Sequence, residues 1–139
     1  IDENGIRKSA SRIKTLISEA EDKGVPTEKI IIAGFSQGGV VAIETALTYP
    51  KKLCGLISIS SYFPTSETIK PHTSNAEIPV LICHGKEDEM VLESMGERAY
   101  RNLMGMGYEV EYKTYPTGHN VIAEELIDIG SWITQQLTT

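Results

Sequence analysis

Residues 29–39 read KIIIAGFSQGG, and this stretch decides the fold. Its unbroken isoleucine run at 30–32 is typical of a strand that is buried on both faces of a parallel sheet. The run stops at an Ala-Gly pair, and a helix-like stretch from Val40 to Tyr49 follows the glycines. The sequence therefore predicts a strand, a sharp turn and a helix, with Ser36 at the apex of the turn.

The turn itself, residues 34–38, fits the pattern G-x-S-x-G of a nucleophile elbow. A hydroxyl held at the apex of such a turn requires a strained backbone, and glycines two residues before and after it prevent clashes. The helix that follows directs the positive end of its dipole at the serine, where negative charge would develop. The alternative is a glycine-rich turn with an ordinary capping serine, and the pattern alone does not separate the two.

The charge, length and cysteine content of the chain limit its possible binding partners, domain number and cellular location. The 139 residues carry a formal net charge of −6, which argues against nucleic acid or an anionic membrane surface, and no apolar run reaches membrane-spanning length. The chain length fits a single domain over residues 1–139. Cys54 and Cys83 lie in apolar strand-like runs without a CxxC pattern, so we expect buried free thiols and a reducing, cytoplasmic location.

Strand-like and helix-like segments alternate along the chain. The expected strands are residues 29–33, 53–60, 79–84 and 108–115, and the expected helices are residues 2–23, 40–49, 92–104 and 121–137. Residues 61–78 show no helical period and are expected to form a long loop. This order predicts an α/β fold with a mostly parallel sheet flanked by helices. The side chains expected to face the sheet from the last helix are Ala123, Leu126, Ile127, Ile129, Gly130, Ile133 and Leu137.

Polar residues follow the third and fourth predicted strands. Asp88 lies in HGKEDEMV at 84–91, and His119 lies in YPTGHN at 115–120. Because the carboxyl ends of parallel strands meet at one edge of a sheet, we expect both side chains to lie near Ser36. The order Ser, acid, His along the chain is the order expected of an α/β-hydrolase.

Other residues compete for these places. Glu87 and Glu89 flank Asp88, and this acidic stretch would serve equally as a solvated loop before the next helix. His84 ends a strand and is expected to brace the following turn rather than act as a base, and His72 has no supporting context. A lone loop histidine such as His119 is by itself most often a surface residue.

The roles follow from general chemistry. His119 would take the Ser36 hydroxyl proton and return it to the leaving group, while Asp88 would fix the imidazole tautomer. The backbone N–H of Gln37, which follows the nucleophile, would donate to the oxyanion. The predicted reaction is a two-step acyl transfer to water through an acyl-Ser36 intermediate.

Three segments resemble the phospholipase/carboxylesterase family, which includes acyl-protein thioesterases. They are GFSQGG at 34–39, HGKEDEMV at 84–91 and YPTGHNV at 115–121, and the resemblance extends over the whole chain. It implies an α/β-hydrolase fold and hydrolysis of carboxylic esters or thioesters, with no cofactor and no metal. Family members take aryl esters, lysophospholipids or S-acylated proteins, so the implied partner is an ester or acyl-thioester substrate.

The resemblance also assigns residues. It places the catalytic functions on Ser36, Asp88 and His119 and the oxyanion-binding amide on Gln37. It further implies an acyl channel lined by Met90, Tyr62 and Phe63. The chain departs from the family pattern D-x-V-V-P after Asp88, where it has Met90 and Leu92, and this bears on the channel rather than on the acid.

The largest departure concerns the front of the family fold. The family carries several strands before the helix expected at 2–23, and one of their loops, with an H-G-x-G-like pattern, supplies a second oxyanion donor; no such pattern occurs here. We therefore expect the C-terminal portion of the fold, lacking the N-terminal strands. A separate N-terminal polypeptide, residues outside the given sequence, or a second copy in a homodimer would supply the rest. The alternative function is a non-catalytic fragment without a complete oxyanion hole.

Overall fold

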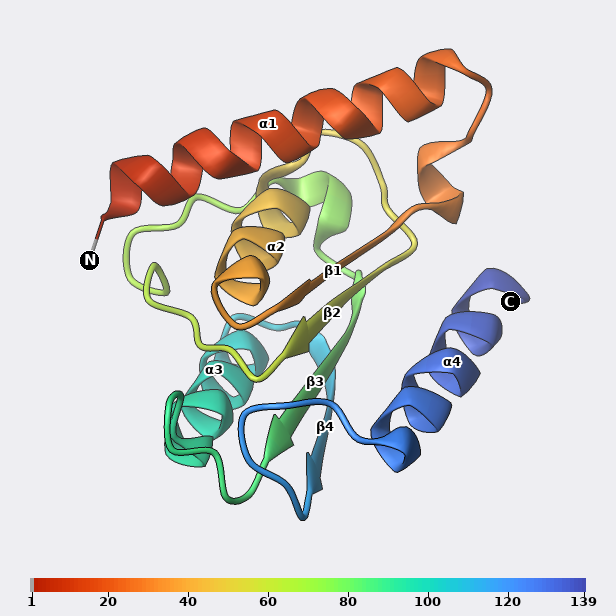
Figure 1. Cartoon of the computed structure of the whole chain (residues 1–139). Coiled ribbons are helices and arrows are strands. Elements are labelled where there is room, and N and C mark those ends of the chain that lie inside the picture. The colour runs from red at the N-terminus through yellow and green to blue at the C-terminus, as the bar shows by residue number, and fades with distance from the viewer. Residues whose placement is uncertain (1) are drawn as a thin grey trace.

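Four parallel strands form the centre of the molecule and lie side by side in the order β1-β2-β3-β4 (Figure 1). They are β1 (Ile31–Phe35), β2 (Gly55–Ile59), β3 (Pro79–Gly85) and β4 (Glu109–Tyr115). The computed structural model describes residues 2–139. The predicted strands are confirmed in order and direction, and their ends differ from the prediction by at most two residues.

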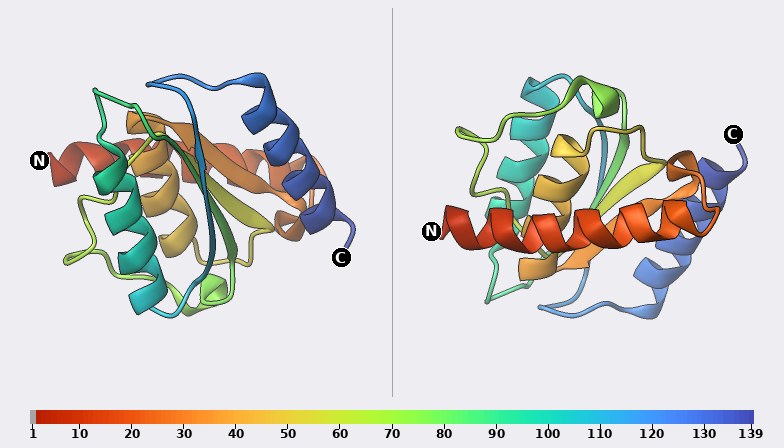
Figure 2. Two further views of the ribbon diagram at one scale, coloured as in Figure 1. Left: turned by 90° about the horizontal axis from the view of Figure 1, so that it is seen from below. Right: turned by 90° about the horizontal axis from the view of Figure 1, so that it is seen from above.

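Helices cover both faces of this sheet (Figure 2). They are α1 (Glu3–Asp22), α2 (Gln37–Thr48), α3 (Glu93–Gly105) and α4 (Ala123–Leu137). α2 and α3 lie on one face with α1 packed across α2, and α4 lies on the other face. Two short 3₁₀ helices, η1 (Thr27–Lys29) and η2 (Thr73–Asn75), interrupt loops, and the crossover from β2 to β3 is the long loop that the sequence predicts.

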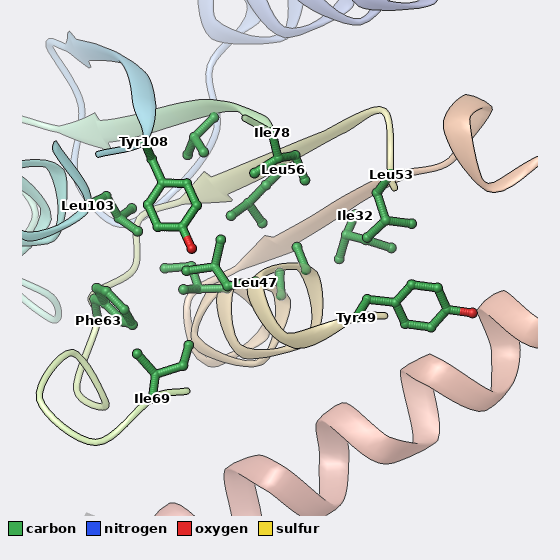
Figure 3. Close-up of a cluster of buried hydrophobic side chains, with 14 of the residues drawn as sticks. Ile32, Leu47, Tyr49, Leu53, Leu56, Phe63, Ile69, Ile78, Leu103 and Tyr108 are labelled. Atoms are coloured by element: carbon green, nitrogen blue, oxygen red, sulfur yellow. The ribbon is translucent and has the colours of Figure 1, made fainter. Parts of the chain in front are cut away.

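The sheet divides the apolar core into two clusters. The larger cluster fills the space between the sheet and α1, α2 and α3, and Figure 3 shows many of its side chains. The smaller cluster lies under α4 and consists of Ile57, Leu81, Cys83, Tyr115, Ile129 and Trp132. Burying one large aliphatic side chain stabilises a fold by about 1.5–3 kcal/mol, so the two clusters stabilise the packing of the helices on both faces of the sheet.

The prediction that β1 is buried on both faces is wrong. Ile32 is buried in the larger cluster, but Ala33 and Phe35 are exposed. The reason is the position of the strand, because within residues 2–139 β1 pairs only with β2. The smaller cluster reaches β1 only through the partly buried Ile31.

The predicted inner face of α4 is also largely wrong. Leu126 and Ile127 are 60% and 70% exposed, whereas Glu125 and Trp132 are buried. The indole of Trp132 packs so closely on β2 that a Cβ on Gly55 would lie 2.8 Å from it. This contact fixes the rotation of the helix, and a rotation that seats Trp132 turns Leu126 and Ile127 outward.

The two cysteines are free, as predicted, but only Cys83 is buried, and Cys54 is half-buried. None of the helices in residues 2–139 combines the length and apolar character needed to cross a membrane.

Candidate active site

Ser36 lies in the sharp turn between β1 and α2. Its φ of 56° and ψ of −122° fall outside the regions that residues with side chains prefer, so the turn holds a strained backbone. Gly34 makes this turn possible, because a Cβ there would overlap the carbonyl oxygen of Gly38. The Ser36 N–H donates to the Ile59 carbonyl at 2.8 Å, which ties the turn to the end of β2.

The hydroxyl of Ser36 does not cap the helix that follows it. Ser36 is the N-cap residue of α2, but its side chain makes no hydrogen bond to the first turn. Its Oγ lies instead 3.1 Å from Nε2 of His119. The alternative of an ordinary capping serine is therefore wrong, and the hydroxyl faces a potential base.

Three side chains form a continuous hydrogen-bonded chain at the carboxyl edge of the sheet. His119 Nε2 lies 3.1 Å from Ser36 Oγ, and His119 Nδ1 lies 2.7 Å from Asp88 Oδ2. A carboxylate only accepts, so Nδ1 of His119 donates and Nε2 is left to accept the Ser36 proton. The three residues follow β1, β3 and β4, which is where the sequence places them.

Asp88 is buried, and its carboxylate accepts three hydrogen bonds. Oδ1 accepts the backbone N–H groups of Met90 and Val91, each at 2.9 Å, while Oδ2 accepts from His119. Burial of the carboxyl works against its ionisation, but the hydrogen bonds from His119, Val91 and Met90 outweigh it and hold the pKa of Asp88 below its usual value. Asp88 is therefore ionised at neutral pH and can orient the imidazole.

The loops after β3 and β4 are joined by their backbones. The Lys86 N–H donates to the Tyr115 carbonyl at 2.8 Å, and the Glu87 N–H donates to the Thr117 carbonyl at 3.0 Å. A Cβ on Gly85 would overlap the backbone of Thr117, so the close approach depends on this glycine. Asp88 and His119 lie on different loops, and these contacts fix the distance between them.

The competing residues occupy other positions. Glu87 and Glu89 are exposed, and the structure brings only Asp88 of this acidic stretch to His119. His72 is exposed and its Nδ1 accepts a backbone N–H two residues on. His84 is fully buried, and its Nε2 bonds to the carbonyl of Val91, whereas the Ser36 hydroxyl meets His119.

The comparison with known proteins agrees with this geometry. Residues 1–137 match the family model for phospholipase/carboxylesterase. The chain belongs to the phospholipase/carboxylesterase family. Its sequence is 37% identical to acyl-protein thioesterase 1 of Gibberella zeae, over 98% of this chain and 60% of the relative. It is 35% identical to carboxylesterase SOBER1 of Arabidopsis thaliana, over 99% of this chain and 61% of the relative.

The fold of the chain matches solved structures of similar proteins. The crystal structure of Arabidopsis thaliana SOBER1 superimposes with a TM-score of 0.91 at 31% identity, over 99% of this chain and 67% of that one. Zea mays acyl-protein thioesterase 2 superimposes with a TM-score of 0.85 at 29% identity, over 98% and 66%. The α/β-hydrolase fold and the predicted family are thus confirmed. The chain spans about six-tenths of the length of these curated relatives.

Gln37, which the sequence predicts as an oxyanion donor, directly follows Ser36. It is the first residue of α2. Its backbone N–H is therefore one of the N–H groups in the first turn that have no hydrogen-bond acceptor within the helix. The same end of α2 carries the positive pole of the helix dipole. The amide therefore lies beside Ser36 with the polarity that an oxyanion requires.

Phe35 is a site residue that the sequence did not reveal. Its ring centroid lies 4.8 Å from that of His119, with the two planes tilted by 43°, and 41% of its surface is exposed. Phe35 occupies the first variable position of G-x-S-x-G, directly before Ser36. That position is the only feature of the sequence from which its contact with the site could have been expected.

Two grooves share Tyr62 and Pro64 in their linings. The smaller, about 310 Å³, runs between α1 and the start of α2 and is lined by Gln37. The larger, about 660 Å³, runs between the 61–78 loop and α3. Tyr62 lines both grooves, and its role in an acyl channel stays a prediction. Phe63 belongs chiefly to the buried core and contributes only an edge to the larger groove, and Met90 is 78% exposed.

Within residues 2–139, no group of three or more His, Cys, Asp or Glu side chains is arranged to hold a metal ion.

Proposed function

We propose that the protein is a serine hydrolase that cleaves carboxylic esters or thioesters. The observation that carries the proposal is the hydrogen-bonded chain from Ser36 through His119 to Asp88, which is the arrangement needed to activate a hydroxyl as nucleophile. Membership of a family with thioesterase and carboxylesterase members supports the substrate class.

The reaction proceeds in two acyl transfers. In the first, Ser36 Oγ bonds to the carbonyl carbon as His119 Nε2 takes its proton, and the leaving alcohol or thiol departs with that proton. In the second, His119 takes a proton from water as the water oxygen bonds to the acyl carbon, and it returns that proton to Ser36 Oγ as the acyl–oxygen bond breaks and the carboxylic acid is released. The ionised Asp88 stabilises the imidazolium that forms in each half-reaction.

The backbone N–H of Gln37 would donate to the carbonyl oxygen as it becomes negative. Losing one of two oxyanion donors costs a hydrolase about 10²–10³-fold in kcat. We propose that a second donor comes from a segment of the protein outside these residues or from a second copy in a homodimer. We also propose a cytoplasmic location, which the two free cysteines support.

The proposal is tested with a fluorophosphonate probe, which phosphonylates only an activated serine. The purified protein is labelled, its intact mass is read and the adduct is mapped by peptide sequencing, with Ser36→Ala as control. We expect a single adduct on Ser36 that is absent from the variant. A folded protein without an adduct would identify the chain as the non-catalytic alternative.

The substrate class needs a second assay. We expect hydrolysis of both a p-nitrophenyl ester and an acyl-thioester, since the same acyl-Ser36 intermediate forms from either. Labelling by the probe with no turnover of either substrate would leave an activated serine but contradict the assigned substrates.

A further inference from the structure

His84 is a buried polar residue that the proposed reaction does not use. It lies near the end of β3 and its side chain is completely inaccessible to solvent. Its Nε2 lies 2.7 Å from the carbonyl oxygen of Val91. A carbonyl only accepts, so Nε2 carries the proton and donates. Its other nitrogen, Nδ1, has no hydrogen-bond partner among residues 2–139. An apolar residue would avoid this desolvation cost, so the imidazole requires a further explanation.

The bond from His84 ends on the residue that holds the acid. Val91 accepts from His84 with its carbonyl and donates its N–H to Asp88 Oδ1 at 2.9 Å. The other oxygen of Asp88 accepts from His119. His84 Nε2 also lies 3.7 Å from Asp88 Oδ2, which is too long for a hydrogen bond but brings the polarised N–H edge toward the negative charge.

The backbone N–H groups of Lys86 and Glu87 anchor the first half of the 85–91 loop to the end of β4 and the segment after it, so the contacts of Val91 matter most for its second half. Lys86, Glu87, Glu89 and Met90 are all exposed, so burial holds only Asp88 and Val91 near the middle and end of the loop. α3 completes the enclosure of His84, because a Cβ on Gly96 would overlap the imidazole. The ring is therefore fixed between β3, the loop and α3.

We propose that His84 is a positioning residue, which holds the 85–91 loop through Val91 so that the Asp88 carboxylate faces His119. This inference rests on the proposed function only for its effect on rate, since the geometry of the His119–Asp88 bond can be measured without turnover. His84 hydrogen-bonds to Val91 and lines neither groove, so it acts on the site through the loop and through Asp88 rather than on the substrate.

The first test replaces the donor. In His84→Leu the Val91 carbonyl loses its partner, and in His84→Gln a side-chain amide can donate in its place. We expect His84→Leu to lower kcat about 10–100-fold with KM unchanged, because a displaced general-base assembly loses rate rather than binding. We expect His84→Gln to recover most of the activity. Equal activity of the Leu variant and the wild type would overturn the proposal.

The second test moves the ring from the opposite side. Gly96→Ala inserts a methyl group against the imidazole, whereas Gly105→Ala, on the same helix, meets no atom within 4 Å. Alanine favours a helix over glycine, so helix propensity alone predicts no loss in either variant, and thermal unfolding checks that Gly96→Ala remains folded despite the added contact. We expect a lower kcat for Gly96→Ala and wild-type kcat for Gly105→Ala. The same loss in both variants would contradict a role of the His84 contact.

A spectroscopic readout separates this inference from the proposed function. The Nδ1–H proton of His119, hydrogen-bonded to a carboxylate, is expected as a downfield proton resonance that His119→Ala removes. We expect His84→Leu, checked for folding by thermal unfolding, to lose or shift this resonance and His84→Gln to keep it. If the resonance responds in this way in a protein without hydrolase activity, the proposed function fails and the positioning role stands. An unchanged resonance in folded His84→Leu overturns the positioning role.

Discussion

At the residue scale, Asp88 is the buried charged group of the candidate active site. It is buried, receives hydrogen bonds from two backbone N–H groups and from His119, and has a lowered pKa. Burial alone would raise the pKa of a carboxyl, so the donors decide the charge state. The two predictions at this scale concern the consequences of that charge.

Replacing Asp88 by Asn removes the charge and reverses the hydrogen-bond polarity at His119. The amide can donate to Nδ1, which would leave Nε2 protonated and unable to accept from Ser36. We expect kcat to fall by about 10⁴-fold, measured with a p-nitrophenyl ester. Glu89→Gln, which changes an exposed carboxylate in the same loop, serves as the control and is expected to retain full activity.

Asp88 also links stability to pH. Its folded-state pKa is below the unfolded value, so the ionised carboxylate stabilises the fold above the ordinary aspartate pKa of about 3.9, and this contribution is lost as the pH falls through the lowered folded value. We expect the difference in the free energy of unfolding between wild type and Asp88→Asn, measured by urea unfolding, to shrink as the pH falls below the ordinary aspartate pKa. A difference that is constant with pH would show that the carboxylate gains nothing from its donors.

At the scale of elements, local spacing predicted strand ends and turns better than it predicted helix faces. Ser36, Asp88 and His119 each follow a strand, and a strand is recognisable from a few adjacent apolar residues. The rotation of α4 depends on Trp132 packing against Gly55, which is far away in the sequence. No periodicity within residues 121–137 contains that information, so Leu126 and Ile127 were predicted to face inward.

The buried carboxyl of Glu125 in α4 gives a prediction at this scale. Neither of its oxygens has a hydrogen-bond partner among residues 2–139, and burial raises its pKa. A raised folded pKa means that the pH-dependent cost of this residue is absent below the ordinary glutamate pKa and grows as the pH rises toward the folded value. We expect Glu125→Met to stabilise the fold by about 1–3 kcal/mol at neutral pH, measured by urea unfolding.

The control for this variant is Glu124→Met, which changes the exposed neighbouring residue and is expected to leave stability nearly unaltered. The advantage of Glu125→Met is expected to fade at acidic pH, where the carboxyl is protonated in both states. An advantage of the same size at every pH would contradict the account of Glu125.

The strand–helix turn depends on one close backbone approach. A Cβ on Gly34 would overlap the Gly38 carbonyl, whereas a Cβ on Gly38 would meet no atom within 4 Å. We expect Gly34→Ala to destabilise the fold by about 1–3 kcal/mol, because the added methyl group must push β1 and α2 apart. Gly38→Ala is the matched control. Thermal unfolding that gave equal stability for the two variants would show that the turn relaxes freely.

At the scale of the whole molecule, the alternation of strands and helices predicted the parallel sheet and its two helical layers. The sequence did not predict the exposure of Ala33 and Phe35, because it shows how apolar a strand is and not which elements cover it. It also did not predict the contact of Phe35 with His119, which arises only when the ends of β1 and β4 meet on one edge of the sheet.

The central claim is that Ser36 becomes covalently acylated, and direct observation of the acyl-enzyme tests it best. The protein is mixed with excess acyl-thioester, quenched in acid within the first turnover and read by intact-mass spectrometry. The account predicts a mass gain of one acyl group that maps to Ser36 and is absent from Ser36→Ala. Substrate hydrolysis without an acyl adduct, or an adduct that persists in Ser36→Ala, would contradict it.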